Sequence, residues 1–373
     1  MVSIALDRVP STRFRSARCP GRAIHLGKDS VISESATPRT VGELGEFALI
    51  DRMNAGRVQA AGVLLGPGDD AALVAAPDGR FVVTTDMLVQ GRHFRLDWSS
   101  PRDIGRKAIA QNAADVVAMG AVPTAFVVAL GCPADTPLEL IDGLADGLWE
   151  EAGRAGGSIA GGDLVRSPEL VLSITAFGDL RGRAPVTRSG ARAGDTIAVA
   201  GRLGWSAAGL AVLAAGADIE RFTEVVAAHR VPQPPYASVL EFLHGDPASG
   251  AGSGPNVPHA LTDISDGLLA DLGHIASASG VQIDLDSSAL RDPVLEPIAR
   301  ALDADAAQWI LAGGEEHAFA AAWPAEVSPP PGWHAVGRVL AGHGVTVDGV
   351  VRPGSGGWES FGGADSAAAA EPR

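Results

Sequence analysis

Helical and strand patterns alternate from residue 99 onward, and this alternation limits the fold more than any other feature of the chain. Residues 99–120 predict a helix, because Ser100 suits the N-cap, Pro101 the first turn and Asp103 the positive end of the helix dipole. The patterns that follow are strands over 124–131, 157–164 and 169–180 and a helix over 137–156. Such alternation is typical of an α/β unit.

A second series of patterns occupies the C-terminal half. Its parts are a strand-bearing segment at 188–201, helices over 205–215 and 267–279, a strand over 281–285 and the segment WILAGGEEHAFAAAW at 309–323. A chain of 373 residues is long enough for about two domains. We therefore expect a two-domain α/β (α+β) fold, in this order: a disordered extension over 1–38, domains over 39–182 and 183–362, and a disordered tail over 363–373. The Gly/Pro/Ser-rich segment 244–259 predicts a mobile surface loop.

The glycine-rich segment LGPGDDAAL, residues 65–73, raises the question of a dinucleotide site. Gly66, Gly68 and Ala71 fit the spacing by which backbone amides approach a pyrophosphate. That fingerprint opens a helix, whereas here the next pattern is a strand, so a Rossmann fold is not indicated. We expect a helix over 40–53 before the segment, and a β-hairpin of 71–75 with 81–88 after it, turning at PDGR.

Composition narrows the possible partners. The net charge is −15 and the pI is near 5.0, which opposes binding to nucleic acid or to anionic membranes. An acidic protein that handled a phosphorylated substrate would need bound cations. No apolar run of about 18 residues predicts a membrane span, and the Arg-rich first 28 residues lack the apolar core of a secretory signal. Cys19 and Cys132 have no metal-ligand spacing, so we expect a cytoplasmic protein without disulfides.

Aspartates recur where predicted strands and turns meet. They are Asp69, Asp70, Asp86, Asp163, Asp263 and Asp266, and Asp115 joins them from within a predicted helix. Singly, each fits a turn or cap residue, and Asp266 would suit the N-terminus of the helix that follows it. Together they fit the oxygen ligands of several Mg²⁺ ions, with Thr84, Thr85 and Ser265 as auxiliary oxygens. The residues alone leave both interpretations open.

Motifs of other phosphate-handling and hydrolytic enzymes are absent. The sequence has no G-x-x-x-x-G-K-[ST] loop, no HRD or DFG element, no H-E-x-x-H and no nucleophile elbow. Only two lysines occur, Lys28 and Lys107, and neither follows a glycine-rich loop. Histidines 93, 274 and 317 carry no recognisable pattern of their own. These exclusions leave the aspartates as the main chemical signal.

Seven segments, taken in order, resemble the thiamine-monophosphate kinase family. They are GPGDDAAL, TTDMLVQGRHF, GRKAIAQNAADVVAMGAVP, IAGGDL, TRSGARAGD, DISDGLLADLGHIA and LAGGEEHAF, and the resemblance covers about residues 40–362. The superfamily includes aminoimidazole ribonucleotide synthetase, selenophosphate synthetase and the hydrogenase-maturation dehydratase. The resemblance implies two α/β domains like those of aminoimidazole ribonucleotide synthetase, with the N-terminal domain pairing in a homodimer.

The resemblance also implies an activity and a set of site residues. The family is a phosphotransferase that makes thiamine diphosphate from thiamine monophosphate and ATP with several Mg²⁺ ions. The implied metal ligands are Asp69, Asp70, Thr84, Thr85, Asp86, Asp115, Asp163, Asp263 and Asp266. The implied ATP contacts are Gly162, Asp163, Arg188 and Ser265, and the implied substrate contacts are His93, Glu315 and Trp358. No catalytic general base is implied.

Some residues depart from the family pattern. The usual GGEDYEL is here GGEEHAF, so Glu316 lengthens a carboxylate and His317 replaces an aromatic residue beside a presumed substrate contact. Gln90 and Ala114 stand where an acidic residue and a serine are usual. The cysteines that would suit selenophosphate synthetase or the maturation enzyme are missing. The alternatives are ATP-dependent activation of another small substrate, a nucleotide-binding protein that has lost transfer, and a metal-dependent phosphohydrolase.

Charge considerations predict the form of the reaction. A phosphate monoester carries about −1.5 to −2 at pH 7 and is already a nucleophile. The main barrier is repulsion between two phosphorylated anions, which bound cations would reduce. We therefore expect direct in-line transfer of the γ-phosphoryl group without a phosphoenzyme, with Arg188 adding positive charge or positioning ATP.

Overall fold

The computed structural model describes residues 39–67, 71–244 and 257–352, and these residues form one compact unit. The predictions made for residues 1–38, the central part of the 244–259 loop and the tail lie outside the described residues, as do Asp69, Asp70 and Trp358.

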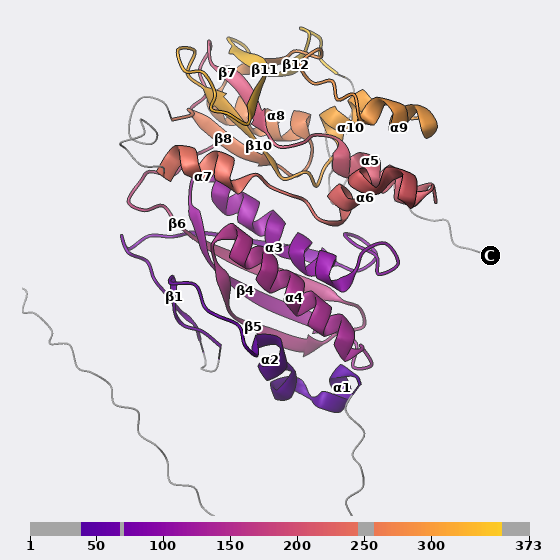
Figure 1. The fold of residues 1–373 in the computed structure, drawn as a ribbon. Coiled ribbons are helices and arrows are strands. Elements are labelled where there is room, and N and C mark those ends of the chain that lie inside the picture. Colours follow the sequence, from indigo (N-terminus) through magenta and orange to yellow (C-terminus); the bar gives the residue numbers. More distant parts are fainter. Residues whose placement is uncertain (1–38, 68–70, 245–256, 353–373) are drawn as a thin grey trace, which may run out of the picture. The chain divides into compact units, whose positions relative to one another are not determined.

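A four-stranded sheet forms the N-terminal half, in the order β3-β6-β4-β5 (Figure 1). Its strands are β3 (Val82–Val89), β4 (Val122–Cys132), β5 (Ser158–Arg166) and β6 (Val171–Asp179). β6 is antiparallel to β3 and β4, whereas β4 and β5 are parallel. Helices α3 (Pro101–Ala118) and α4 (Leu138–Ala155) pack on one face of the sheet. The helix and strand patterns predicted over 99–180 are confirmed.

Two glycines allow α3 and α4 to approach closely. A Cβ on Gly105 would lie 2.3 Å from the backbone oxygen of Leu144, and one on Gly147 would lie 2.0 Å from that of Arg102. The predicted N-terminus of α3 is also confirmed, because Ser100 and Asp103 form a capping box. The helix therefore has a defined start and a fixed contact with its neighbour.

A six-stranded sheet forms the C-terminal half, in the order β12-β9-β11-β7-β10-β8. Its strands are β7 (Thr196–Ala200), β8 (Ala260–Ile264), β9 (Gln282–Leu285), β10 (Ala318–Trp323), β11 (Trp333–Leu340) and β12 (Gly344–Val347). The accompanying helices are α5 (Trp205–Ala214), the 3₁₀ helix η1 (Ile219–Phe222), α6 (Thr223–Arg230), α7 (Tyr236–His244), α8 (Leu268–Ser279), α9 (Leu295–Ala301) and α10 (Ala306–Ala312). The boundary predicted after residue 182 falls between β6 and β7.

The segment before the first sheet corrects two predictions, and the first is the single helix expected over 40–53, which is divided into two helices at Gly45 with φ of 82°. It contains α1 (Val41–Leu44), α2 (Glu46–Asn54), β1 (Val63–Leu65) and β2 (Leu73–Val74). The predicted hairpin of 71–75 with 81–88 is wrong, because β2 pairs with β1 and β3 pairs with β6. Eight residues of β3 find partners along β6, which satisfies many more backbone groups than the short β2 would.

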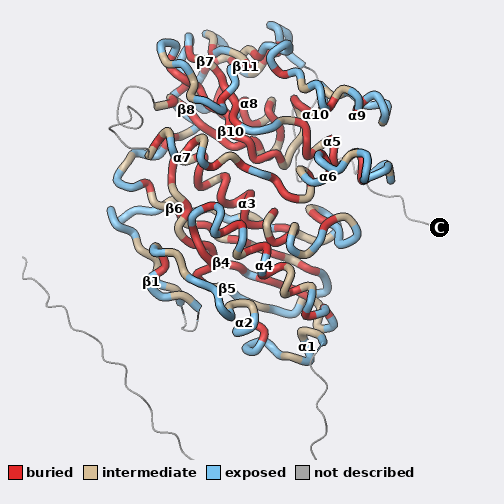
Figure 2. The backbone as a smooth tube through the Cα atoms, viewed as in Figure 1, coloured by how far each residue is buried: buried red, intermediate tan, exposed pale blue. Residues whose placement is uncertain are grey.

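Helix α3 lies between the two sheets. It contacts β3, β4 and β6 on one side, and it also contacts β8, α6 and α7 of the C-terminal half. Thirteen of its residues are buried, and Figure 2 shows the buried backbone continuing through this part of the molecule. The buried cluster around α3 extends to Ala198, Leu261 and Phe319 in the second sheet. Side chains of α3 can therefore meet residues from both sheets.

Candidate functional site

Alternation along β3 separates three of the predicted ligands. Thr84 and Asp86 pair in register with the buried Ala176 and Ile174 of β6, whereas Thr85 pairs with Thr175 on the opposite face. The Thr85 hydroxyl donates to the backbone oxygen of Ile174 over 2.9 Å. Its hydroxyl is therefore on the opposite side of the sheet from the other two.

Thr84 and Asp86 meet α3. Thr84 Oγ1 donates to Oδ2 of Asp115 over 2.9 Å, and the backbone N–H of Asp86 donates to Oδ1 of Asn112 over 2.9 Å. Asn112 is fully buried and is held by the backbone oxygen of Ala108. The structure thus brings Asp86 and Asp115 near each other through contacts that join β3 to α3.

The end of β8 supplies Asp263 and the loop that follows supplies Asp266. Asp263 is buried, and its Oδ2 lies 3.1 Å from Nδ1 of His317. The loop is fixed by Asp271 in the first turn of α8, whose Oδ2 accepts from the backbone N–H groups of Ser265, Asp266 and Gly267, each over 3.1 Å. Asp271 is absent from the predicted site. Its position one turn after the SDG turn is the signal that would have indicated its role.

The carboxylates of Asp86, Asp115, Asp263 and Asp266 influence one another, and we call them the acidic cluster. Burial and then repulsion from Asp263 and Asp86 raise the pKa of Asp115 to about 7. Burial, followed by Asp263, likewise raises the pKa of Asp266. The pKa of Asp86 is raised by burial, although His317 opposes this effect. Negative charge from three separate elements is thus concentrated in one partly buried place.

The acidic cluster can be compared with the ligands that Mg²⁺ requires. Within residues 39–67, 71–244 and 257–352, no three His, Cys, Asp or Glu side chains gather closely enough to enclose a metal ion. Mg²⁺ is usually held by one or two carboxylates and completed by water and substrate phosphates. Hard oxygen donors that repel one another fit such an ion, because a cation between them would remove the repulsion.

Asp163 occupies a different place from the acidic cluster. Asp163 lies on the edge strand β5 and pairs with Ala129 of β4. The row of paired residues continues through Ser173 of β6 to Met87 of β3, whose side chain is on the sheet face opposite Asp86. Three strand spacings amount to about 14 Å. The Asp163 carboxylate accepts from the backbone N–H of the next residue over 3.0 Å. The structure therefore does not bring Asp163 together with Asp86.

Beside Asp163 the protein has a cavity of about 800 Å³. Gly162, Asp163, Trp149 and Met53 are among the residues that line it. A Cβ on Gly162 would lie 1.9 Å from the backbone oxygen of Val128, so this position accepts only glycine. The cavity is large enough for a nucleotide-sized ligand, since small-molecule sites commonly have about 300–1,000 Å³.

Two predicted substrate contacts, His93 and Glu315, are joined by a lysine. Lys107 Nζ donates to the backbone oxygen of His93 over 3.0 Å and forms an ion pair with Oε1 of Glu315 over 2.8 Å. The His93 ring accepts from the backbone N–H of Val89 over 3.0 Å, and burial lowers its pKa. Lys107 is absent from the predicted site residues. Its spacing of eight residues from Asp115, on the same helix face, is the signal for it.

The GGEEHAF segment sends three successive side chains in three directions. Glu315 meets Lys107, Glu316 accepts from the backbone N–H of Ser206 over 2.8 Å at the start of α5, and His317 contacts Asp263. Glu315 and His317 have φ angles of 62° and 52°, which produce this divergence. Burial raises the pKa of Glu316 to about 8. The longer carboxylate of Glu316 therefore binds the start of α5, while His317 contacts Asp263 of the acidic cluster.

The predicted ATP contacts Arg188 and Ser265 lie near β8. Arg188 Nε donates to Oγ1 of Thr262 over 3.2 Å, and its charge opposes the rise in the pKa of Asp266. The backbone oxygen of Ser265 accepts from the N–H of Glu315 over 2.7 Å. Both residues thus lie beside the acidic cluster, whereas Gly162 and Asp163 do not.

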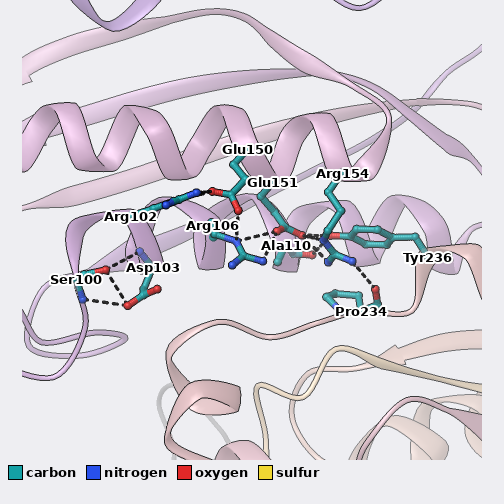
Figure 3. A network of polar contacts seen from close by, with 10 residues as sticks. All are labelled: Ser100, Arg102, Asp103, Arg106, Ala110, Glu150, Glu151, Arg154, Pro234 and Tyr236. Carbon is teal, nitrogen blue, oxygen red and sulfur yellow. Dashed lines mark hydrogen bonds and ion pairs between the residues drawn. The ribbon is translucent and has the colours of Figure 1, made fainter. Parts of the chain in front are cut away.

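A buried polar network holds α3 in place (Figure 3). Glu151 of α4 is fully buried and accepts from Arg154 Nε over 2.7 Å, from Arg106 over 3.3 Å and from the Tyr236 hydroxyl over 3.2 Å. The Arg154 guanidinium also stacks over the Tyr236 ring at 4.3 Å. This network joins α3, α4 and α7, so the helix that carries Lys107 and Asp115 is fixed at its middle.

Comparisons with known proteins agree with this architecture. Residues 68–180 match the family model described as AIR synthase related protein, N-terminal domain. Over 331 residues the chain is 57% identical to a thiamine-monophosphate kinase of Mycobacterium tuberculosis. The aligned residues cover 88% of this chain and 95% of that protein. In the part that the structure describes, no helix is long and apolar enough to cross a membrane.

Solved structures of thiamine-monophosphate kinases are also similar to this chain. The thiamine-monophosphate kinase from Stenotrophomonas maltophilia K279a superposes with a TM-score of 0.70 at 33% identity, covering 82% of this chain and 97% of that one. A structure described as AaThiL complexed with AMPPCP and TMP superposes with a TM-score of 0.67 at 28% identity, covering 88% of this chain and 100% of that one.

Proposed function

Because the chain belongs to the thiamine-monophosphate kinase family, we propose that it transfers the γ-phosphoryl group of ATP to thiamine monophosphate and forms thiamine diphosphate. The observation that carries this proposal is the 57% identity to the M. tuberculosis kinase, which extends over 95% of that protein. The similar AaThiL structure is described as a complex with AMPPCP, an ATP analogue, and with TMP, which supports ATP and thiamine monophosphate as the two substrates.

Several Mg²⁺ ions are part of the proposal. The acidic cluster and Thr84 would hold them, and Asp69, Asp70, Thr85 and Asp163 are proposed as further ligands. When bound, Mg²⁺ would neutralise phosphate charge and align the reacting groups. The support in this chain is the raised pKa of Asp115, which burial and the charges of Asp263 and Asp86 produce.

Direct in-line transfer fits the groups at the site. The acceptor phosphate is already an anionic nucleophile, so no side chain needs to remove a proton from it. Arg188 and Ser265, close to Asp266, would contact the phosphates of ATP. Gly162 and Asp163 are proposed as further ATP contacts, and the cavity of about 800 Å³ beside them would take part of the nucleotide.

The thiamine phosphate would lie near His93 and Glu315, with Trp358 as a further proposed contact. Burial raises the pKa of Glu315, but the charge and the hydrogen bond of Lys107 are the main effects that lower it, and the pKa of Glu315 lies below its ordinary value. Its side chain is 35% exposed. An ionised, accessible carboxylate suits the cationic thiazolium ring of thiamine.

A homodimer is proposed from the exposed part of the sheet face opposite α3. Val83 and Met87 of β3 and Val165 of β5 are each more than half exposed on the face that α3 does not cover. Apolar residues gathered on one sheet face are typical of an interface. A second copy of the N-terminal half is the proposed occupant, and sedimentation equilibrium of the purified chain would measure the state. We also propose a cytoplasmic location, where ATP for the reaction is available.

One assay tests the function and its alternatives. The protein is incubated with ATP, Mg²⁺ and thiamine monophosphate, and thiamine diphosphate, ADP and free phosphate are quantified together. Equal amounts of thiamine diphosphate and ADP are expected. Free phosphate without thiamine diphosphate would indicate hydrolysis, and the absence of any product would indicate a nucleotide-binding protein without transfer activity. Turnover only with another small acceptor would indicate a superfamily relative.

A further inference from the structure

Lys107 occupies a position that the proposed reaction does not yet explain. It is one of two lysines in the sequence and the only one among the residues that the structure describes. Its Nζ contacts the backbone oxygen of His93 at 3.0 Å and Oε1 of Glu315 at 2.8 Å. It therefore touches the two residues expected to bind the thiamine phosphate.

The ion pair has its ammonium inside and its carboxylate outside. The Lys107 side chain is 3% exposed, whereas that of Glu315 is 35% exposed. A ligand that arrives from solvent would therefore meet the carboxylate, with the ammonium behind it. Loss of one partner from such a pair leaves the other charge uncompensated, so the geometry of Glu315 depends on Lys107.

The neighbouring histidine does not replace this lysine. His229 Nδ1 lies 3.6 Å from Oε2 of Glu315 and 3.2 Å from the Ser206 hydroxyl. Burial, and then the charge of Lys107, lower the pKa of His229 to about 4. The imidazole is thus neutral at pH 7, and Lys107 is the charge that balances Glu315.

The pair also connects segments that are far apart in the sequence. His93 follows β3, Lys107 lies on α3, and Glu315 precedes β10. Glu315 has a left-handed backbone with φ of 62°, and its N–H donates to the backbone oxygen of Ser265 over 2.7 Å. Lys107 therefore holds a strained residue of the C-terminal half against a loop of the N-terminal half.

We propose that Lys107 is a positioning residue that fixes Glu315, and with it the His93 loop, in the arrangement that recognises the thiamine part of the substrate. The inference rests on the proposed function and adds a residue to the substrate site. Lys107 acts through its contacts with Glu315 and His93, so its removal affects binding of thiamine monophosphate.

A double-mutant cycle tests the inference. Wild type, Lys107→Met, Glu315→Gln and the double variant are compared by steady-state kinetics and by calorimetric titration with thiamine monophosphate. Lys107→Met is expected to raise KM and Kd for thiamine monophosphate about tenfold, with kcat and the KM for ATP changed less than about threefold. The double variant is expected to resemble Glu315→Gln alone within about twofold, because both substitutions remove one shared function.

A matched control and a conservative variant complete the test. Arg102→Met breaks an ion pair of α3 with Glu150 at the exposed end of the same helix and is expected to leave all constants unchanged. Lys107→Arg keeps the charge and is expected to recover part of the affinity. If Lys107→Met does not fold, Lys107→Gln takes its place, and a wild-type Kd for thiamine monophosphate in Lys107→Gln overturns the inference.

The outcomes separate the inference from the proposed function. An unchanged KM for thiamine monophosphate in Lys107→Met, or effects that multiply in the double variant, overturns the positioning role while leaving the kinase assignment intact. A wild-type protein that forms no thiamine diphosphate overturns the proposed function itself.

Discussion

Thr84 of β3 donates a hydrogen bond to Asp115 of α3 over 2.9 Å, and this contact joins two of the expected metal ligands. The bond favours the ionised form of Asp115, yet burial and the charges of Asp263 and Asp86 still raise its pKa to about 7. The acidic cluster is therefore unfavourable for the protein alone. A bound cation would relieve this repulsion.

The first prediction concerns Asp115 itself. Asp115→Asn keeps an oxygen for the Thr84 hydroxyl but removes a negative charge, so we expect kcat to fall at least about a hundredfold, a loss of about 2.7 kcal/mol of transition-state stabilisation. The free energy of unfolding without Mg²⁺ should stay equal or rise, because repulsion is relieved. Coupled assays at saturating ATP and urea unfolding measure the two quantities. Wild-type kcat at ordinary Mg²⁺ would remove Asp115 from the site.

The second prediction concerns close packing of α3 and α4. Gly147→Ala places a Cβ 2.0 Å from the backbone oxygen of Arg102, so the helices must separate, and we expect a loss of about 1–3 kcal/mol in the free energy of unfolding. Gly153→Ala in the same helix meets nothing within 4 Å and should gain about 0.5–1 kcal/mol. Urea unfolding of both variants measures the difference. Equal stabilities for the two variants would contradict the observed packing.

The third prediction is a pH dependence. The pKa of Glu316 is raised to about 8 by burial, so the folded state holds a proton that the unfolded state releases above about pH 4. The resulting stability is fully present below pH 4 and is lost as the pH rises to about 8. Glu316→Gln keeps an oxygen for the Ser206 N–H and removes the titration. It should reduce the downward slope of stability between about pH 5 and 8 by up to 1.4 kcal/mol per pH unit. Urea unfolding at several pH values measures the slope, and an unchanged slope would contradict the assignment.

These examples show which parts of the molecule local sequence patterns predict. The start of α3 follows from Ser100 and Asp103, because a capping box depends on residues three apart. The partner of β3 does not follow from local patterns. The PDGR turn favours a hairpin, but pairing with β6 satisfies a longer ladder of backbone groups, and β6 lies about eighty residues away.

The same distinction holds in the candidate site. The family resemblance implies that Asp86 and Asp115 are both metal ligands, and the structure brings the two residues near each other through Thr84 and Asn112. The pairing of Lys107 with Glu315 was not expected, because it depends on how the two halves pack. The different directions of Glu316 and His317 depend on left-handed φ angles at Glu315 and His317, which are not glycines, and the sequence contains no signal for them.

The final prediction concerns the loop that carries Asp266. The Asp271 carboxylate accepts three backbone N–H groups at 3.1 Å, and its removal would leave all three without that partner. Asp271→Ala should therefore lower the free energy of unfolding by about 2–4 kcal/mol, since hydrogen bonds to charged groups contribute about 1.5–3 kcal/mol each and water would satisfy part of the loop. Asp271→Asn keeps one accepting oxygen and removes a charge that Asp263 and Asp266 repel, so it should lose less than half as much. Both variants should also raise the Mg²⁺ concentration that gives half-maximal activity, more for Ala than for Asn, because Asp266 loses its fixed position. An Asp271→Ala variant as stable as the wild type would show that the three N–H groups do not depend on this side chain.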